Sequence, residues 1–163
     1  MRKIVKYMLW IFLFIVLVFF AYFFIGNPKP AEKVSWGVNF SLKQTDFLGL
    51  DDRETYLAIL DDLKAQKVKI SVHWDLLEKK DDKFDFSELD WQMAEAEKRN
   101  VQVLLAVGMR TPRWPECHIP DWAKNMTKEE QEENILEMIS QIVKRYKNSP
   151  SLAGWQVENE SFL

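Results

Sequence analysis

The chain has 163 residues and a formal net charge of −3, and 47% of its residues are apolar. Nineteen consecutive apolar residues (7–25) hold nine of the aromatic side chains, while residues 26–163 carry 19 Lys and Arg against 25 Asp and Glu. Regular apolar patterns in this second part exclude a disordered chain, and its acidic charge without a basic stripe argues against nucleic-acid binding. The single cysteine, Cys117, excludes a disulfide framework or a cysteine-rich zinc site within one chain.

The apolar run predicts a transmembrane helix. Nineteen helical residues rise about 28 Å, close to the hydrocarbon thickness of a bilayer. Three basic residues precede the run and should stay in the cytoplasm: Arg2, Lys3 and Lys6. We therefore expect residues 1–26 to hold a single-pass anchor crossing the membrane from Tyr7 to Ile25, with the rest of the chain extracytoplasmic. A cleaved signal peptide is the alternative, although its apolar core is usually only about 7 to 15 residues long.

Residues 27–33 contain two prolines and read as a short, stiff linker, after which strands and helices alternate. Apolar runs predict strands at residues 34–40, 68–74, 101–107 and 152–157. Helical spacing predicts helices that begin near Asp51 or Asp52, at Ser87 and at Thr127. Ser87 with Asp90, and Thr127 with Glu130, are typical of helix-capping pairs. The order βαβαβαβ indicates an α/β fold with a parallel sheet and right-handed crossovers.

The type of α/β fold follows from the glycines and from where the aromatic residues fall. No glycine-rich phosphate-binding turn follows the first strand, which argues against a doubly wound nucleotide-binding fold, and we expect no cofactor. Long aromatic-rich segments follow the strands, where a (β/α)8 barrel places its active site. A complete barrel needs about 250 residues. Residues 34–163 are therefore expected to form a partial (β/α)8 TIM barrel, with the first four strands and three helices.

The most informative stretch is Gly154-Trp155-Gln156-Val157-Glu158-Asn159-Glu160. It places a carboxylate beside an amide at the C-terminal end of a buried strand. A carboxyl group near apolar walls at a barrel mouth has its ionised form disfavoured, which suits a general acid near neutral pH. Glycoside hydrolysis uses such an acid opposite a second carboxylate. A solvated glutamate at a strand end would show the same pattern.

The stretch from Trp155 to Glu160 resembles the fourth-strand motif of the clan of retaining (β/α)8 glycoside hydrolases, with a likeness to bacterial β-galactosidases and cellulase-like members. Two further passages are similar to this clan, and they occur in the clan's order. They are Trp74-x-x-x-Glu78 followed by Phe84-Asp85-Phe86-x-x-Leu89-Asp90, and Thr111-Pro112-Arg113-Trp114-Pro115. The resemblance implies that Glu160 is the catalytic acid/base and that Asn159 binds the sugar hydroxyl next to the anomeric carbon. It also implies a β-linked oligo- or polysaccharide as substrate.

The sequence departs from the clan in several respects. Lys69 stands where the clan usually has Arg, and Ser161 stands where Pro commonly follows the catalytic Glu. Strict strand alternation sends neighbouring side chains to opposite faces, so Asn159 and Glu160 both reach the site only if the strand end is twisted or bulged. The clan's nucleophile belongs to strand seven, so we expect this chain to be a fragment that is inactive alone.

Other residues are weaker candidates, each with a structural alternative. His73 is expected to line a sugar subsite, or else to be a hydrogen-bonded barrel histidine. Trp114 and Trp122 are expected to stack on sugar rings, or else to pack within loops. Arg110 is expected to hold a hydroxyl or carboxylate, or else to form a surface ion pair.

We expect no metal ion, because the tempting Glu116-Cys117-His118 sequence supplies too few ligands. The alternative to an enzyme is a non-catalytic carbohydrate-binding or degenerate half-barrel protein. The open barrel edges would also permit self-association.

Overall fold

A computed structural model of the chain describes residues 2–24, 32–113 and 117–160. The chain separates into two compact units, Met1–Val34 and Ser35–Leu163. The first holds helix α1 (Arg2–Phe24), in which residues 3–24 are long and apolar enough to cross a membrane, with a mean hydropathy of 2.6. Its length and composition fit a membrane anchor and equally a signal sequence close to the N-terminus. Ile25 and most of the expected linker, up to residue 31, lie outside the described residues.

The second unit is built on one parallel sheet of four strands, in the order β1-β2-β3-β4. The strands are β1 (Gly37–Phe40), β2 (Lys67–Ser71), β3 (Gln102–Val107) and β4 (Leu152–Val157). Each pairs in parallel with its sequence neighbour, as βαβ crossovers require. The predicted fold class is therefore confirmed: the sheet and its helices correspond to part of a (β/α)8 barrel. The first strand begins later than predicted, at Gly37, and the second ends earlier, at Ser71.

Helices α3 (Asp52–Asp61), α5 (Ser87–Lys98) and α6 (Lys128–Tyr146) follow the first three strands, as predicted. The capping box at the start of α6 is confirmed, because Thr127 Oγ1 accepts from the Glu130 backbone N–H and the Glu130 carboxylate accepts from the Thr127 N–H. The capping box predicted for Ser87 and Asp90 is wrong. Phe86 occupies the N-cap position without a side-chain hydrogen bond, and the Asp90 carboxylate instead pairs with Arg145 of α6.

Three short helical segments were not predicted: α2 (Leu42–Leu48), α4 (Trp74–Leu77) and the 3₁₀ helix η1 (Asp121–Ala123). Local capping explains α2, which Ser41 caps at its start and which ends at Gly49 in the left-handed conformation. Helix α4 begins at Trp74, within the range predicted for the second strand. Segments this short carry too few apolar repeats for a helical period to be recognised.

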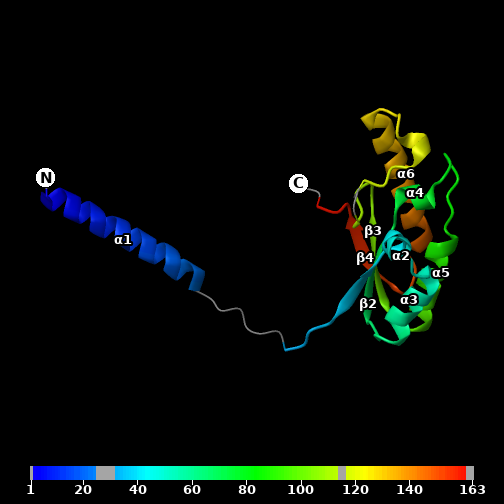
Figure 1. Ribbon diagram of the computed structural model, residues 1–163, viewed down its shortest axis with the longest axis horizontal. Coiled ribbons are helices and arrows are strands. Elements are labelled where there is room, and N and C mark those ends of the chain that lie inside the picture. The colour runs from blue at the N-terminus through cyan, green and yellow to red at the C-terminus, as the bar shows by residue number, and fades with distance from the viewer. Residues whose placement is uncertain (1, 25–31, 114–116, 161–163) are drawn as a thin grey trace. The chain divides into compact units, whose positions relative to one another are not determined.

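The core lies between the sheet and the helices, and Figure 1 shows α5 and α6 on the same side of the sheet. Alternate strand residues face this core and are buried: Val68, Ile70, Val103, Leu105 and Val107. Helix α6 adds a buried stripe of Ile135, Met138, Ile142 and Tyr146.

The other face of the sheet corresponds to the barrel interior. One row across it is formed by residues in register on the four strands: Asn39, Lys69, Leu104 and Gly154. Asn39 is exposed and Lys69 and Leu104 are half-buried. Just beyond the end of β4, Asn159 is half-buried and Glu160 is exposed.

Candidate functional site at the carboxyl ends of the strands

Each strand is followed by residues with polar side chains. Ser41 follows β1, His73 follows β2, Thr111 follows β3, and Glu158, Asn159 and Glu160 follow β4. Because the strands are parallel, all these residues meet at one edge of the sheet. In (β/α)8 barrels this edge carries the active site.

The backbone after β4 leaves the extended conformation abruptly. Glu158 has φ of 59° and Glu160 has φ of 54°, both in the left-handed region that side-chain-bearing residues seldom adopt. Asn159 is half-buried and Glu160 is exposed. Strict strand alternation therefore no longer applies to Asn159 and Glu160, so their side chains need not point to opposite faces of the sheet.

The Glu158 side chain fixes this turn to the loop after β3. Its Oε1 accepts from the Met109 backbone N–H at 2.9 Å, and its Oε2 accepts from the Arg110 N–H at 2.6 Å. Two backbone bonds run alongside, from Glu158 N to Val107 O at 2.9 Å and from Asn159 N to Arg110 O at 2.8 Å. The ends of β3 and β4 are thus joined by four hydrogen bonds within a few residues of Glu160.

The Asn159 side chain is oriented by Gln156. Gln156 Nε2 donates to Asn159 Oδ1 at 3.3 Å and to the Glu158 carbonyl at 3.2 Å. Lys69 Nζ in turn donates to Gln156 Oε1 at 3.4 Å. With Oδ1 engaged in this way, the Nδ2 group of Asn159 is the part of the amide suited to donate to a ligand. Lys69 therefore reaches the Asn159 amide through Gln156.

His73 is buried in a network of hydroxyl groups. Its Nε2 lies 2.9 Å from Ser41 Oγ, and its Nδ1 lies 2.9 Å from Thr111 Oγ1. Burial, reinforced by His118 and Lys43, lowers the pKa of His73 to about 3, so the ring is neutral near pH 7. Both ring nitrogens already have partners and the side chain is only 2% exposed. A direct contact between His73 and a sugar therefore stays a prediction that would need this network to rearrange.

His118 packs against His73 from the loop after β3. The two ring centroids are 4.2 Å apart, and His118 is also buried. Burial lowers the pKa of His118 as well, and its Nε2 has no hydrogen-bond partner among the described residues. The two uncharged rings therefore lie in contact, in the segments that follow β2 and β3.

Glu78, after α4, ties two tryptophans together. Its Oε2 accepts from Trp74 Nε1 at 2.7 Å, and its backbone carbonyl accepts from Trp122 Nε1 at 2.8 Å. The two indole rings meet edge to face at 5.7 Å. Trp122 is half-buried and packs against Trp74, and the stacking of its ring on a sugar stays a prediction.

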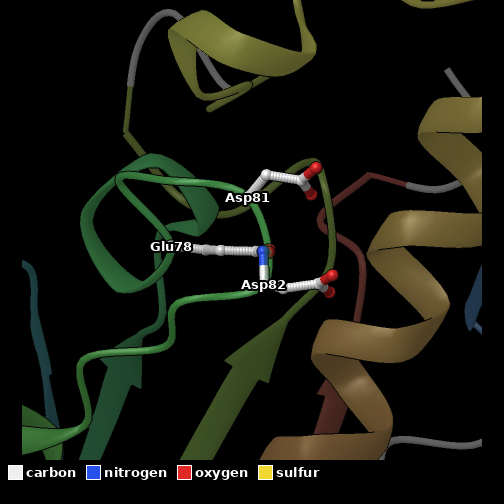
Figure 2. Close-up of side chains that lie close together, drawn as sticks. All are labelled: Glu78, Asp81 and Asp82. Atoms are coloured by element: carbon white, nitrogen blue, oxygen red, sulfur yellow. The ribbon is translucent and has the colours of Figure 1, made fainter.

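Glu78 also belongs to an acidic group with Asp81 and Asp82, in which one oxygen of each lies within 4.8 Å of the others. Figure 2 shows the Glu78 side chain directed at the backbone nitrogen of Asp82, while the two aspartate carboxylates project from the turn. The Asp82 N–H donates to Glu78 Oε1 at 2.9 Å, so both Glu78 oxygens already accept hydrogen bonds. Burial raises the pKa of Glu78. The Glu78 carboxylate therefore has a structural role: it holds the turn from Glu78 to Asp82.

Two other predicted residues, Arg110 and Trp114, follow β3 in the sequence. Arg110 is half-buried, and its backbone bonds both to the Glu158 carboxylate and to Asn159. Trp114 lies outside the described residues, as do Glu116 and Ser161. The structure thus brings Arg110 and Asn159 together through the backbone, with Glu160 as the next residue.

The roles of Glu158 and Gly108 were not predicted from the sequence. Gly108 directly follows β3 with φ of 135°, and a Cβ placed there would lie 2.5 Å from Glu158 Oε1. A glycine immediately after a buried strand was the available signal, because it indicates a close approach that a side chain would block.

The fold and the placement of polar residues define a class: part of a (β/α)8 barrel with polar side chains gathered at the carboxyl ends of its strands. The chain belongs to Glycosyl hydrolase family 10, whose sequence profile matches residues 38–163. Among proteins with curated functions, none matches the chain in sequence.

Solved structures with a similar fold include three β-galactosidases. The enzyme of the Antarctic haloarchaeon Halorubrum lacusprofundi superposes with a TM-score of 0.58 at 20% identity, covering 77% of this chain and 21% of that chain. The cold-adapted enzyme of Rahnella sp. R3 has a TM-score of 0.57 at 19% identity, covering 80% of this chain and 22% of that chain. The enzyme of the psychrophilic Marinomonas ef1 has a TM-score of 0.55 at 16% identity, covering 78% of this chain and 22% of that chain. This chain therefore spans about a fifth of the length of each of these proteins, and the likeness establishes the fold alone.

Proposed function

We propose that the chain is the N-terminal part of the catalytic barrel of a retaining glycoside hydrolase, with Glu160 as its acid/base. The observation that carries the proposal is the position of the Asn159-Glu160 pair. It leaves β4 in a left-handed turn at the carboxyl edge of the sheet, with Glu160 exposed. Membership of a glycoside hydrolase family supports the same reaction and a β-linked oligo- or polysaccharide as substrate.

In this mechanism Glu160 first protonates the glycosidic oxygen as the bond to the anomeric carbon breaks. A second carboxylate about 5 to 5.5 Å away forms the glycosyl-enzyme ester, which a water molecule, deprotonated by Glu160, then hydrolyses. Glu78 and Glu158 are poorly suited to be this nucleophile, because both carboxylate oxygens of each already accept hydrogen bonds. We therefore assign the nucleophile to a later strand of a complete barrel. Asn159 would bind the hydroxyl beside the anomeric carbon through its Nδ2 group.

The acid/base role is tested with Glu160→Ala in the polypeptide encoded by the whole open reading frame. Aryl β-glycosides with poor and good leaving groups are compared, because only a poor leaving group needs protonation. We expect at least about 100-fold slower turnover of the poor leaving group, within the range for general acid–base catalysis. With the activated substrate, added azide should restore turnover and yield a glycosyl azide, since azide needs no base. Equal losses on both substrates, without azide rescue, would contradict the role.

Asp81→Ala is the matched control, an exposed carboxylate in the loop after α4. Its turnover of both substrates should equal that of the parent. If the unmodified polypeptide binds oligosaccharide, shown by saturable quenching of tryptophan fluorescence, but hydrolyses no β-glycoside, it is instead a carbohydrate-binding protein.

We further propose that α1 anchors the protein, with its N-terminus in the cytoplasm and the barrel outside. The apolar helix and the three basic residues before the run support this orientation. Membrane fractionation with N-terminal sequencing tests it. An anchor gives an intact N-terminus in the membrane fraction and a barrel accessible to external protease, whereas a shortened, soluble product would indicate a cleaved signal sequence.

A further inference from the structure

The turn that carries Asn159 and Glu160 is held from the side by Glu158. The Glu158 carboxylate accepts two consecutive backbone N–H groups, from Met109 and Arg110, at 2.9 and 2.6 Å. An ionised carboxylate that accepts two N–H groups makes stronger bonds than a neutral acceptor would. These bonds cross from β4 to β3, so they fix the direction in which the chain leaves the sheet.

The backbone on either side of Asn159 is unfavourable without such support. Glu158 and Glu160 both have positive φ, at 59° and 54°. Left-handed backbone at residues with side chains persists only where surrounding contacts impose it. The contacts that hold it include the bonds of the Glu158 carboxylate, the Glu158 N–H bond to Val107 O, the Asn159 N–H bond to Arg110 O, and the bonds of the Gln156 amide.

Gly108 makes room for the Glu158 carboxylate. A Cβ at position 108 would lie 2.5 Å from Glu158 Oε1 and 2.6 Å from its Cδ, closer than such atoms can approach. Glycine is also favoured there by its φ of 135°. Residues 108 and 158 therefore fit together as one unit: the missing side chain of the first gives space to the carboxylate of the second.

We propose that Glu158, seated against Gly108, is a positioning residue that sets the orientation of Glu160 and Asn159 for glycoside cleavage. This inference rests on the proposed function of Glu160. Glu158 itself touches no reacting atom in this scheme, and it acts through the backbone that it holds. Loss of its carboxylate should therefore impair the chemical step more than substrate binding.

The first experiment is Glu158→Gln in the polypeptide encoded by the whole open reading frame. A glutamine has one acceptor oxygen, so one of the Met109 and Arg110 N–H groups loses its partner. We expect kcat on an aryl β-glycoside to fall at least about tenfold while KM changes less than about threefold, with the folded far-ultraviolet circular dichroism spectrum retained. In the full chain, the amide proton resonances of Met109 and Arg110 should shift upfield and exchange faster. An unchanged kcat in a folded variant would overturn the proposal.

The second experiment approaches the same contact from Gly108 and decides the matter if Glu158→Gln does not fold. Gly108→Ala should displace the Glu158 carboxylate from the Met109 and Arg110 N–H groups and lower kcat at least about tenfold. Glu158→Asp, which is shorter by one methylene, should lower kcat through the same two bonds, and the double variant should lose less than about threefold more than the worse single variant, because both substitutions break one contact. An unchanged kcat in Gly108→Ala, or single losses that multiply in the double variant, would overturn the proposal. Gly49→Ala is the matched control: its φ is also positive, at 68°, but a Cβ added there would meet nothing within 4 Å, so the substitution introduces backbone strain without touching a carboxylate.

The catalytic role of Glu160 and the positioning role of Glu158 are tested by separate variants. If Glu160→Ala leaves turnover intact, the assignment of Glu160 is wrong, whatever Glu158 does. If Glu160→Ala abolishes turnover and both Glu158→Gln and Gly108→Ala retain the parent kcat, only the positioning role is wrong.

Discussion

The rings of His73 and His118 meet edge to face in the core of the strand-end site, with their centroids 4.2 Å apart. Both side chains are only 2% exposed, and burial is the main cause of the lowered pKa of each. Two adjacent neutral histidines make the folded state sensitive to acid, because each would have to be protonated without water around it.

The first prediction concerns the pH dependence of stability. In the unfolded chain a histidine has a pKa of about 6.5, whereas folded His73 has a pKa of about 3. Between these two pKa values the unfolded state therefore binds more protons than the folded state. The free energy of unfolding should be highest above pH 6.5 and should fall as the pH drops toward 3, by at most about 1.4 kcal/mol per pH unit for this residue. Urea unfolding at pH 7.5 and 5.0 measures the fall.

His73→Gln is the matched variant, because glutamine keeps hydrogen-bonding capacity but does not titrate. Its free energy of unfolding should fall less than that of the parent between the two pH values. Equal falls in parent and variant would show that His73 is already protonated, or titrates normally, in the folded protein.

The second prediction concerns the Glu78 carboxylate. Glu78→Gln leaves a single acceptor oxygen for the Trp74 indole and the Asp82 N–H, so one donor faces the new NH₂ group. Leaving a buried donor unsatisfied costs about 1 to 3 kcal/mol of unfolding free energy. Urea unfolding measures this loss. Asp81→Asn, which changes an exposed neighbour, should lie within about 0.5 kcal/mol of the parent, and a similar loss in both variants would contradict the specific role of Glu78.

The third prediction concerns the start of α6. Thr127→Ala removes the oxygen that accepts the Glu130 N–H, and the free energy of unfolding should drop by about 1 kcal/mol. Thr127→Ser keeps an equivalent hydroxyl and should lose much less. Thermal unfolding of the two variants side by side checks the prediction, and indistinguishable midpoints would show that the cap contributes nothing.

The fourth prediction contrasts two faces of α6. Ile142 is fully buried, whereas Leu136 on the same helix is 64% exposed. Ile142→Ala should destabilise the protein by about 2 to 5 kcal/mol, since it removes packed atoms and leaves a cavity. Leu136→Ala makes a change of similar size in exposed surroundings and should cost under about 0.5 kcal/mol. Urea unfolding would contradict the packing of α6 on the sheet if the two losses were equal.

The alternation of four apolar runs with amphipathic helices could be predicted from sequence because each element carries its own period. β4 was predicted with its observed bounds, and the Thr127 capping box was recognised from a local spacing. The short helices α2 and α4 were not predicted, because helices of seven and four residues contain too few apolar positions to show a helical period. The pair Ser87 and Asp90 satisfied the spacing of a cap, yet the Asp90 side chain bonds to Arg145, 55 residues away.

By itself, the sequence determined the fold class, the apolar N-terminal helix and the Asn159-Glu160 pair at a strand end, because these depend on periodicity and composition within short windows. Only the tertiary structure decided that His73 is enclosed by hydroxyl groups from two other strand ends, and that Glu158 occupies the space beside Gly108. Such contacts join residues some 30 to 50 positions apart. Which partner a polar side chain finds at that separation depends on the register of the sheet, and this register is set only when the whole core packs.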